Sequence, residues 1–292
     1  MSFVTGNIVS SLVSVIYSSY RTIEYNADYF SYGNLSLFKH TSYASMYVLF
    51  STMILIYFLL NRIYSNHVWI RNIYIGTIIF FCIIIYFLAS RAGYVSLFIS
   101  VVFVAGYLSL RFKKRIYILI VIIVIPSVMY LFVSNPRVKY LVNLPQIVQA
   151  GNLNTTYEGV IVRYFIIRES LKIIKEHHWL GTGTGDVKDN LVERYRKSNI
   201  KFALENKLNA HNQFLETFIG LGIPGFLTLV LLLFYPLYHA VKRRNFLMIS
   251  FLLIITVNFL FESMLNTQAG IIFFAFFYSL LMVNIDKTKS DI

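Results

Sequence analysis

The sequence contains few charged residues and a single cysteine. Asp, Glu, Lys and Arg make up 13% of its 292 residues, about half the share found in an ordinary soluble domain. Together with apolar runs of membrane-spanning length, this scarcity excludes a soluble enzyme, a nucleic-acid-binding domain and a disordered chain. Cys82 lies in an apolar run, and as the lone cysteine it excludes an intrachain disulfide and a metal centre built from cysteines.

Hydrophobic residues are abundant, at 57% of the chain, and the mean hydropathy is +0.65. The hydrocarbon core of a bilayer needs about 20 mostly apolar residues per spanning helix. We therefore expect an all-α, polytopic integral membrane protein with about eight transmembrane helices. The expected spans are residues 3–20, 42–60, 73–90, 93–110, 116–134, 212–238, 247–261 and 267–284.

One long stretch between the fifth and sixth spans has a more polar composition. Loops of such length are usually functional or separately folded. We predict one membrane domain in three segments: transmembrane helices in 1–134, an extracytoplasmic loop with amphipathic helices in 135–210, and transmembrane helices with a short cytoplasmic tail in 211–292.

The formal net charge of +13 is interpreted through the positive-inside rule, by which lysine and arginine accumulate in short cytoplasmic connections. The alternate connections hold only Arg21, Lys39 and Arg91 outside the long loop. This bias predicts cytoplasmic termini and an extracytoplasmic 135–210 loop. The cytoplasmic set is Arg62, Arg71, Arg111, Lys113, Lys114, Arg115, Lys242, Arg243, Arg244, Lys287 and Lys289.

Two arginines on the predicted outer side need an explanation beyond topology. Arg91 lies in a tight turn between two spans; it is either an interfacial side chain that reaches the headgroups or a ligand for an anion. Arg163 lies in residues 159–178, a helical pattern that we expect to lie on the outer membrane surface. A buried guanidinium needs a partner or a site. Arg163 falls within the apolar arc of that pattern (Ile166, Ile167, Leu171, Ile173, Ile174), opposite Arg168, Glu169, Lys172, Lys175 and Glu176.

His211 begins the sixth span on the same predicted face. Downstream of it, Gly222, Pro224 and Gly225 predict a broken or kinked helix, which membranes tolerate where protein or water surrounds the backbone. Glu262, at the outer end of the seventh span, is either an interfacial carboxylate or a partner that orients His211 or an arginine.

The run Gly181–Asp186 is rich in glycine but follows a helix, so it lacks the strand-to-helix context of a nucleotide-binding loop. Its backbone could form an anion nest, although a flexible turn is favoured. No cluster of His, Cys, Asp and Glu has metal-ligand spacing. We expect neither a metal ion nor another cofactor.

Two arginines and a histidine on one face suit a transfer from a pyrophosphate donor. Arginine is the preferred planar ligand for phosphate oxygens, and histidine can accept a proton from an attacking hydroxyl near neutral pH. The arginines would neutralise charge that develops on the leaving group.

These residues lie in segments that resemble the O-antigen ligase and O-antigen polymerase superfamily of bacterial envelope enzymes. His211-Asn212, nine residues, Gly222, two residues and Gly225 resemble the ligase signature. The Leu88–Arg91 turn, and Arg163 with the helix that ends at Leu180–Gly183, are similar to two further family blocks. Weaker likeness is found at Phe38–Tyr43 and Glu262–Leu265. The resemblance extends from about residue 38 to 284, with fewer spans than relatives usually have, so we expect the family's N-terminal helices to be missing.

The resemblance implies a GT-C-like fold and metal-independent, inverting glycosyl transfer at the outer face of the bacterial inner membrane. The donor would be a glycan on undecaprenyl pyrophosphate, and the acceptor a sugar hydroxyl of a glycolipid such as lipid A-core. Arg91 and Arg163 would bind the donor pyrophosphate and His211 would be the general base, with Asn212 and Glu262 as further substrate-binding candidates. The expected partners are thus these two substrates and membrane lipid, without nucleic acid.

Two alternatives stay open at this point. A polymerase would join repeat units on the same carrier and would need the same donor chemistry. A polysaccharide or lipid transporter is less favoured, because transporters place ionisable residues and broken helices near the midplane. Here the unusual residues gather at one face.

Overall fold

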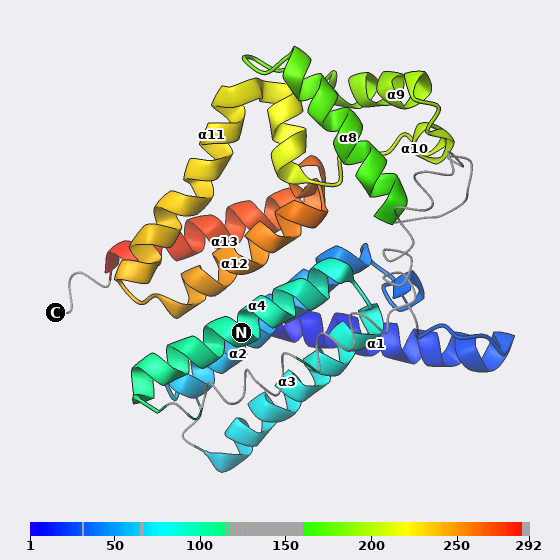
Figure 1. Cartoon of the computed structure of the whole chain (residues 1–292). Helices are drawn as coiled ribbons and strands as arrows, with labels where there is room; N and C mark the ends of the chain where they lie inside the picture. Colours follow the sequence, from blue (N-terminus) through cyan, green and yellow to red (C-terminus); the bar gives the residue numbers. More distant parts are fainter. Residues whose placement is uncertain (31, 65–66, 115, 117–125, 127–159, 288–292) are drawn as a thin grey trace. The chain divides into compact units, whose positions relative to one another are not determined.

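The computed structural model describes the chain except for residues 31, 65–66, 115, 117–125, 127–159 and 288–292. All regular secondary structure in the described part is helical (Figure 1), which confirms the all-α class. The chain divides into two compact units. Unit 1 contains Met1–Val128, Leu237–Asn258 and Ile272–Ile292, and unit 2 contains Met129–Pro236 and Phe259–Ile271.

Five described helices are long and apolar enough to cross a membrane. They are α1 (Ser2–Tyr25), α2 (Thr41–Leu60), α3 (Val68–Leu88), α4 (Arg91–Phe112) and α11 (Gln213–Lys242). Two shorter apolar helices, α12 (Phe246–Phe261) and α13 (Gln268–Lys287), coincide with the last two expected spans. Apart from Ile116 and Pro126, the expected span at 116–134 lies outside the described residues. The chain is therefore a polytopic membrane protein.

Unit 1 is built around α2, which contacts α1, α3 and α4. Helix α1 buries Ser11, Ser14 and Ser18, while Ile16 and Ile23 on its other side are exposed. This inverts the pattern of a soluble helix and suits a membrane, where small polar residues let helices approach and apolar residues face lipid.

Aromatic rings fill the core of unit 1. Phe50 of α2 and Phe3 of α1 both pack against Phe277 of α13, with ring centroids 4.9 and 4.7 Å apart. Edge-to-face contacts of this kind add to the stabilisation that comes from burial alone. They join the start of the chain to its last helix.

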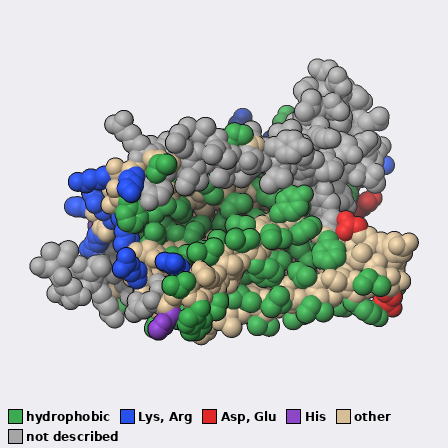
Figure 2. Space-filling view, turned by 90° about the horizontal axis from the view of Figure 1, so that it is seen from below, with side chains coloured by type: hydrophobic (Ala, Val, Ile, Leu, Met, Phe, Trp, Pro, Cys, Tyr) green, Lys and Arg blue, Asp and Glu red, His purple; other side chains and the backbone are tan. Residues whose placement is uncertain are grey.

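Basic side chains gather at one end of unit 1. Arg111, in the last turn of α4, donates hydrogen bonds to Asn61 Oδ1 and to Leu60 O at the end of α2, at 3.2 and 3.1 Å. Figure 2 shows a face on which apolar side chains form a broad band and Lys and Arg cluster at one end. At this end, Arg111 joins the connection after α4 to the end of α2.

Unit 2 has its own apolar core, formed by α8 (Val160–Glu176), α9 (Val187–Lys197) and α10 (Lys201–Glu205). The predicted arcs of α8 are partly wrong. Ile167 and Leu171 are exposed, whereas Glu169 and Ser170 are fully buried, and Phe165 belongs to the core. The reason is that α9 and α10 pack against α8. The face of α8 that they cover is shifted by one residue from the face that hydropathy alone selects. The buried set is Ile161, Val162, Phe165, Ile166, Glu169, Ser170, Ile173 and Ile174.

Helix α11 bends at Gly222, whose backbone (φ 61°, ψ −156°) is not helical. Pro224 has no N–H, and Ile223 N donates instead to His178 O at 2.9 Å, so two helix carbonyls lose their usual donors. The loop after α8 replaces them. Thr182 N donates to Ile219 O at 2.7 Å and Gly183 N to Gly220 O at 3.0 Å.

We call this contact, between residues 178–183 and 219–223, the bend clamp. The glycines are needed because backbone meets backbone. A Cβ on Gly222 would lie 2.3 Å from Trp179 O, and one on Gly181 would lie 2.5 Å from the carbonyl carbon of Gly220. The glycine-rich run and the bend at Gly222 therefore contact each other directly. This contact sets the angle of the helix segment that follows His211.

Candidate functional site

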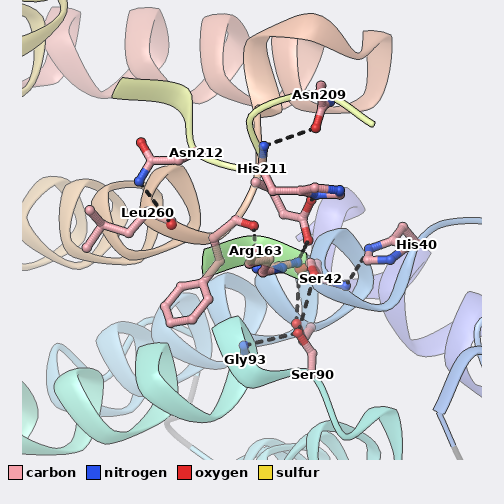
Figure 3. Close-up of polar contacts among 12 residues, drawn as sticks. His40, Ser42, Ser90, Gly93, Arg163, Asn209, His211, Asn212 and Leu260 are labelled. Atoms are coloured by element: carbon pink, nitrogen blue, oxygen red, sulfur yellow. Dashed lines mark hydrogen bonds and ion pairs between the residues drawn. The ribbon is translucent and has the colours of Figure 1, made fainter. Parts of the chain in front are cut away.

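Arg163 and His211 lie near one another in unit 2 (Figure 3), and both contact Glu262 of the same unit. Arg163 comes from the first described turn of α8, His211 from the loop before α11, and Glu262 from the residue after α12. His211 Nδ1 is 3.3 Å from Glu262 Oε2, and Arg163 Nη2 is 3.2 Å from Glu262 Oε1. Three of the residues singled out in the sequence therefore share one carboxylate.

Glu262 is the central group of this cluster. Its side chain is only 9% exposed, whereas those of Arg163 and His211 are 23% and 25% exposed. A buried carboxylate is costly without partners, and here each oxygen has one. Arg163 is held further by a hydrogen bond from Nη1 to Phe261 O at 2.9 Å. The geometry leaves the two basic side chains partly accessible while their common carboxylate is enclosed.

The loop that carries His211 is shaped by local hydrogen bonds. His211 adopts a left-handed backbone conformation (φ 47°), and its N–H is bonded to Asn209 Oδ1 at 3.1 Å. Asn212 is the residue before α11, where its Oδ1 accepts the N–H of Leu215 at 3.1 Å. Its Nδ2 also donates to Leu260 O at 3.3 Å. Asn212 thus caps α11 and ties it to the end of α12.

Glu216 is a residue of this site that the sequence analysis missed. It is 6% exposed, and its carboxylate accepts hydrogen bonds from Ala210 N (2.9 Å), Ser263 Oγ (3.2 Å) and Asn266 Nδ2 (2.6 Å). These donors flank His211 on one side and follow Glu262 on the other. In the sequence, Glu216 is a lone carboxylate in the apolar run after Asn212. Acidic residues are common in the first turn of a helix, so this signal did not mark Glu216 as a site residue.

Gln213 makes a parallel connection, since its Oε1 accepts the N–H of Leu265 at 2.6 Å. The first turn of α11 therefore holds the segment after Glu262 through two neighbouring side chains. This connection fixes the spacing between His211 and its carboxylate partner.

A buried polar layer lies within the helical core of unit 2. Burial raises the pKa of the Tyr195 hydroxyl, and the carboxylates of Glu216 and Glu169 raise it further. Among the described residues, the buried atoms without a hydrogen-bond partner include Tyr195 Oη, Glu169 Oε2 and Ser170 Oγ. Groups of this kind usually hold ordered water.

Arg91 belongs to unit 1 and is the first residue of α4. The turn before it is closely packed: Ser90 is buried, its Oγ accepts the N–H of Gly93 at 3.3 Å, and a Cβ on Gly93 would lie 2.8 Å from Ser45 of α2. The small residues around Arg91 thus give its backbone a defined place. A role for Arg91 at the site of unit 2 stays a prediction.

The first part of the glycine-rich run uses its amides within the protein. The N–H groups of Gly181, Thr182, Gly183 and Asp186 are all donated to backbone carbonyls, two of them across the bend clamp. The sequence favoured a flexible turn for this run, whereas Gly181–Gly183 are packed against the bend of α11. Within the described residues, no group of three or more His, Cys, Asp or Glu side chains could hold a metal ion.

Comparison with known proteins identifies one family. The family model of the O-antigen ligases matches residues 75–230, which is more than half of the chain. The matched stretch includes Arg91, Arg163 and His211 and stops before Glu262. No curated protein matches the sequence.

Proposed function

Because the chain belongs to the O-antigen ligase family, we propose that it is a membrane glycosyltransferase that moves a glycan from undecaprenyl pyrophosphate to a sugar hydroxyl of a glycolipid such as lipid A-core. The observation that carries this proposal is the Glu262 carboxylate shared by His211 and Arg163. That cluster joins a potential base to a potential phosphate ligand in one partly accessible site.

His211 is the proposed general base. A carboxylate at Nδ1 favours the tautomer with the proton on that nitrogen, which leaves Nε2 as the acceptor. The acceptor hydroxyl oxygen then attacks the anomeric carbon of the donor while its proton moves to Nε2. The bond between the anomeric carbon and the phosphate oxygen breaks, its electron pair leaves with the carrier pyrophosphate, and the anomeric configuration inverts.

Arg163 is the proposed ligand for the leaving pyrophosphate. A guanidinium has five N–H donors, and the contacts to Phe261 O and Glu262 use two of them. The remaining donors can bind phosphate oxygens on which negative charge develops. Arg91 is proposed as a second phosphate ligand. Asn212 and Glu216 are proposed as positioning residues, since their bonds hold the His211 loop and the segment after Glu262.

We propose that both termini are cytoplasmic, that the 135–210 loop is periplasmic and that the reaction occurs at the outer face of the bacterial inner membrane. The distribution of lysine and arginine supports this orientation. The three-segment division at residues 134 and 210 is part of the same proposal.

The first experiment measures glycan transfer by the purified chain in nanodiscs, with a lipid-linked donor and a lipid A-core acceptor. His211→Ala should lower the rate by roughly 10²–10⁴-fold, the usual contribution of a general base. Arg163→Lys should also impair transfer, because a point charge does not reproduce a planar fork. His177→Ala and Arg196→Ala, at exposed positions of the same unit, are the matched controls.

Retained transfer in His211→Ala would remove that residue from the mechanism, and normal donor turnover by Arg163→Lys would make Arg163 a structural charge. Acceptor choice is tested separately by expression in bacteria that lack their ligase or their polymerase. Restored attachment to lipid A-core supports the ligase, whereas restored chain length alone supports the polymerase. Glycan or lipid movement without any transfer would support the transporter.

A further inference from the structure

The turn between α8 and α9 presents two large apolar side chains to its surroundings. Trp179 is 68% exposed and Leu180 is 79% exposed, the highest values among the described large apolar residues of unit 2. Isolated apolar residues on a surface are ordinary. Here two adjacent residues protrude from a loop that is otherwise polar, with His177 and His178 before them and Thr182 after them.

The backbone of this turn is attached to α11 on both sides of the two residues. His178 O accepts the N–H of Ile223 at 2.9 Å, and Thr182 N donates to Ile219 O at 2.7 Å. Trp179 O lies so close to Gly222 that no Cβ would fit between them. The turn that carries the two side chains is therefore attached beside the bend of α11 (Figure 1).

That place adjoins an exposed apolar stripe on a membrane-spanning helix. Leu221 is exposed at the bend, and Leu227, Leu231 and Phe234 follow it on α11 at helical spacing, each more than half exposed. Apolar side chains that stay exposed along a spanning helix are those expected to face lipid. The turn lies at the bend, where this stripe begins, and so continues the lipid-facing surface of α11.

The chemistry of the turn fits the boundary between lipid chains and headgroups. Tryptophan is enriched at membrane interfaces because its ring is apolar and its N–H is polar. The exposed Lys175, His177 and His178, just before Trp179, supply polar groups on the side of water and headgroups. An apolar tip preceded by basic and polar residues is typical of segments that enter the interface.

We propose that Trp179 and Leu180 insert into a bilayer leaflet and bind lipid acyl chains there. In the orientation proposed above, this is the outer leaflet. The insertion anchors the α8–α9 segment to the membrane surface at the bend of α11. It thereby sets the depth of the helix segment that begins after His211, relative to the leaflet in which a lipid-linked donor would lie.

The test uses the fact that the chain contains two tryptophans, Trp69 and Trp179. Trp69→Phe leaves Trp179 as the sole fluorophore of the full chain, reconstituted in nanodiscs with plain or chain-brominated phospholipids. We expect brominated chains to remove most of the Trp179 emission and aqueous iodide to have little effect. The matched reporter is a triple variant, Trp69→Phe, Trp179→Phe and Arg196→Trp, which moves the fluorophore to an exposed position of α9. Its emission should respond to iodide and not to brominated lipid.

Quenching of Trp179 by iodide as strong as that of the α9 reporter, without an effect of brominated lipid, would overturn the proposal. Emission shielded from both quenchers would also overturn it, because a protein surface would then cover the turn. Neither measurement involves glycan transfer. A failed insertion is therefore distinguishable from a failed assignment of function.

Discussion

Gly222→Ala should open the bend clamp and weaken unit 2 far more than an ordinary glycine substitution. The backbone at Gly222 (φ 61°, ψ −156°) is in a region that only glycine occupies readily, at a cost of about 1–3 kcal/mol for other residues. The new Cβ would also lie 2.3 Å from Trp179 O. Because that atom is backbone, no side-chain rotation relieves the contact, and the loop must withdraw.

Withdrawal breaks the three hydrogen bonds of the clamp, from Thr182 N, Gly183 N and Ile223 N. Each of these hydrogen bonds contributes about 0.5–1.5 kcal/mol to the free energy of unfolding. With the backbone strain, the expected loss is roughly 3–7 kcal/mol, a large share of the roughly 5–15 kcal/mol that stabilises a typical native protein. The matched control is Gly185→Ala in the same loop, where a Cβ would meet no atom within 4 Å.

The assay is thermal unfolding in detergent combined with amide hydrogen exchange. Gly222→Ala should unfold at a lower temperature, and the amides of Thr182, Gly183 and Ile223 should exchange faster, while Gly185→Ala behaves as the native chain. Equal unfolding temperatures and unchanged exchange at these amides in Gly222→Ala would refute the clamp as the contact that holds the bend.

Two substitutions in the core of unit 2 test its buried polar groups. Burial raises the pKa of Glu169, but hydrogen bonds from Lys172 and Arg168 outweigh it and hold the pKa below its ordinary 4.5. Stability from this carboxylate is therefore present above that pH and lost as pH falls. Glu169→Gln should lower stability by about 1–3 kcal/mol at neutral pH and reduce the acid dependence of thermal unfolding, and an unchanged acid profile would contradict the assignment. Burial and the nearby carboxylates of Glu216 and Glu169 raise the pKa of Tyr195, so its contribution to stability declines as pH rises above 10.0. Tyr195→Phe should lose that alkaline decline in thermal unfolding. An alkaline decline in Tyr195→Phe equal to that of the native chain would contradict this assignment.

Local sequence features predicted the spans well and one helix face poorly. The expected spans in the described part coincide with helices, because hydropathy over twenty residues averages out single exceptions. The face of α8 was misplaced, because Ile167 and Leu171 were assigned to its buried side and Glu169 to the opposite one. Ion pairs with Arg168 and Lys172 allow the Glu169 carboxylate to be buried. Ile167 is then left on the exposed side of α8.

The sequence by itself determined the membrane class, the helical spans and the residue types from which a site could be built. Hydropathy, charge bias and motif spacing are properties of neighbouring residues, so they can be evaluated without a fold. Only the tertiary structure decided that Glu262 joins His211 to Arg163, residues 51 and 99 positions away from it in the chain. It also decided that the glycine-rich run supports the bend of α11, because two of its amides donate to carbonyls of that helix. These contacts depend on which carbonyls lose their donors and which faces pack, and both are settled only when distant segments meet.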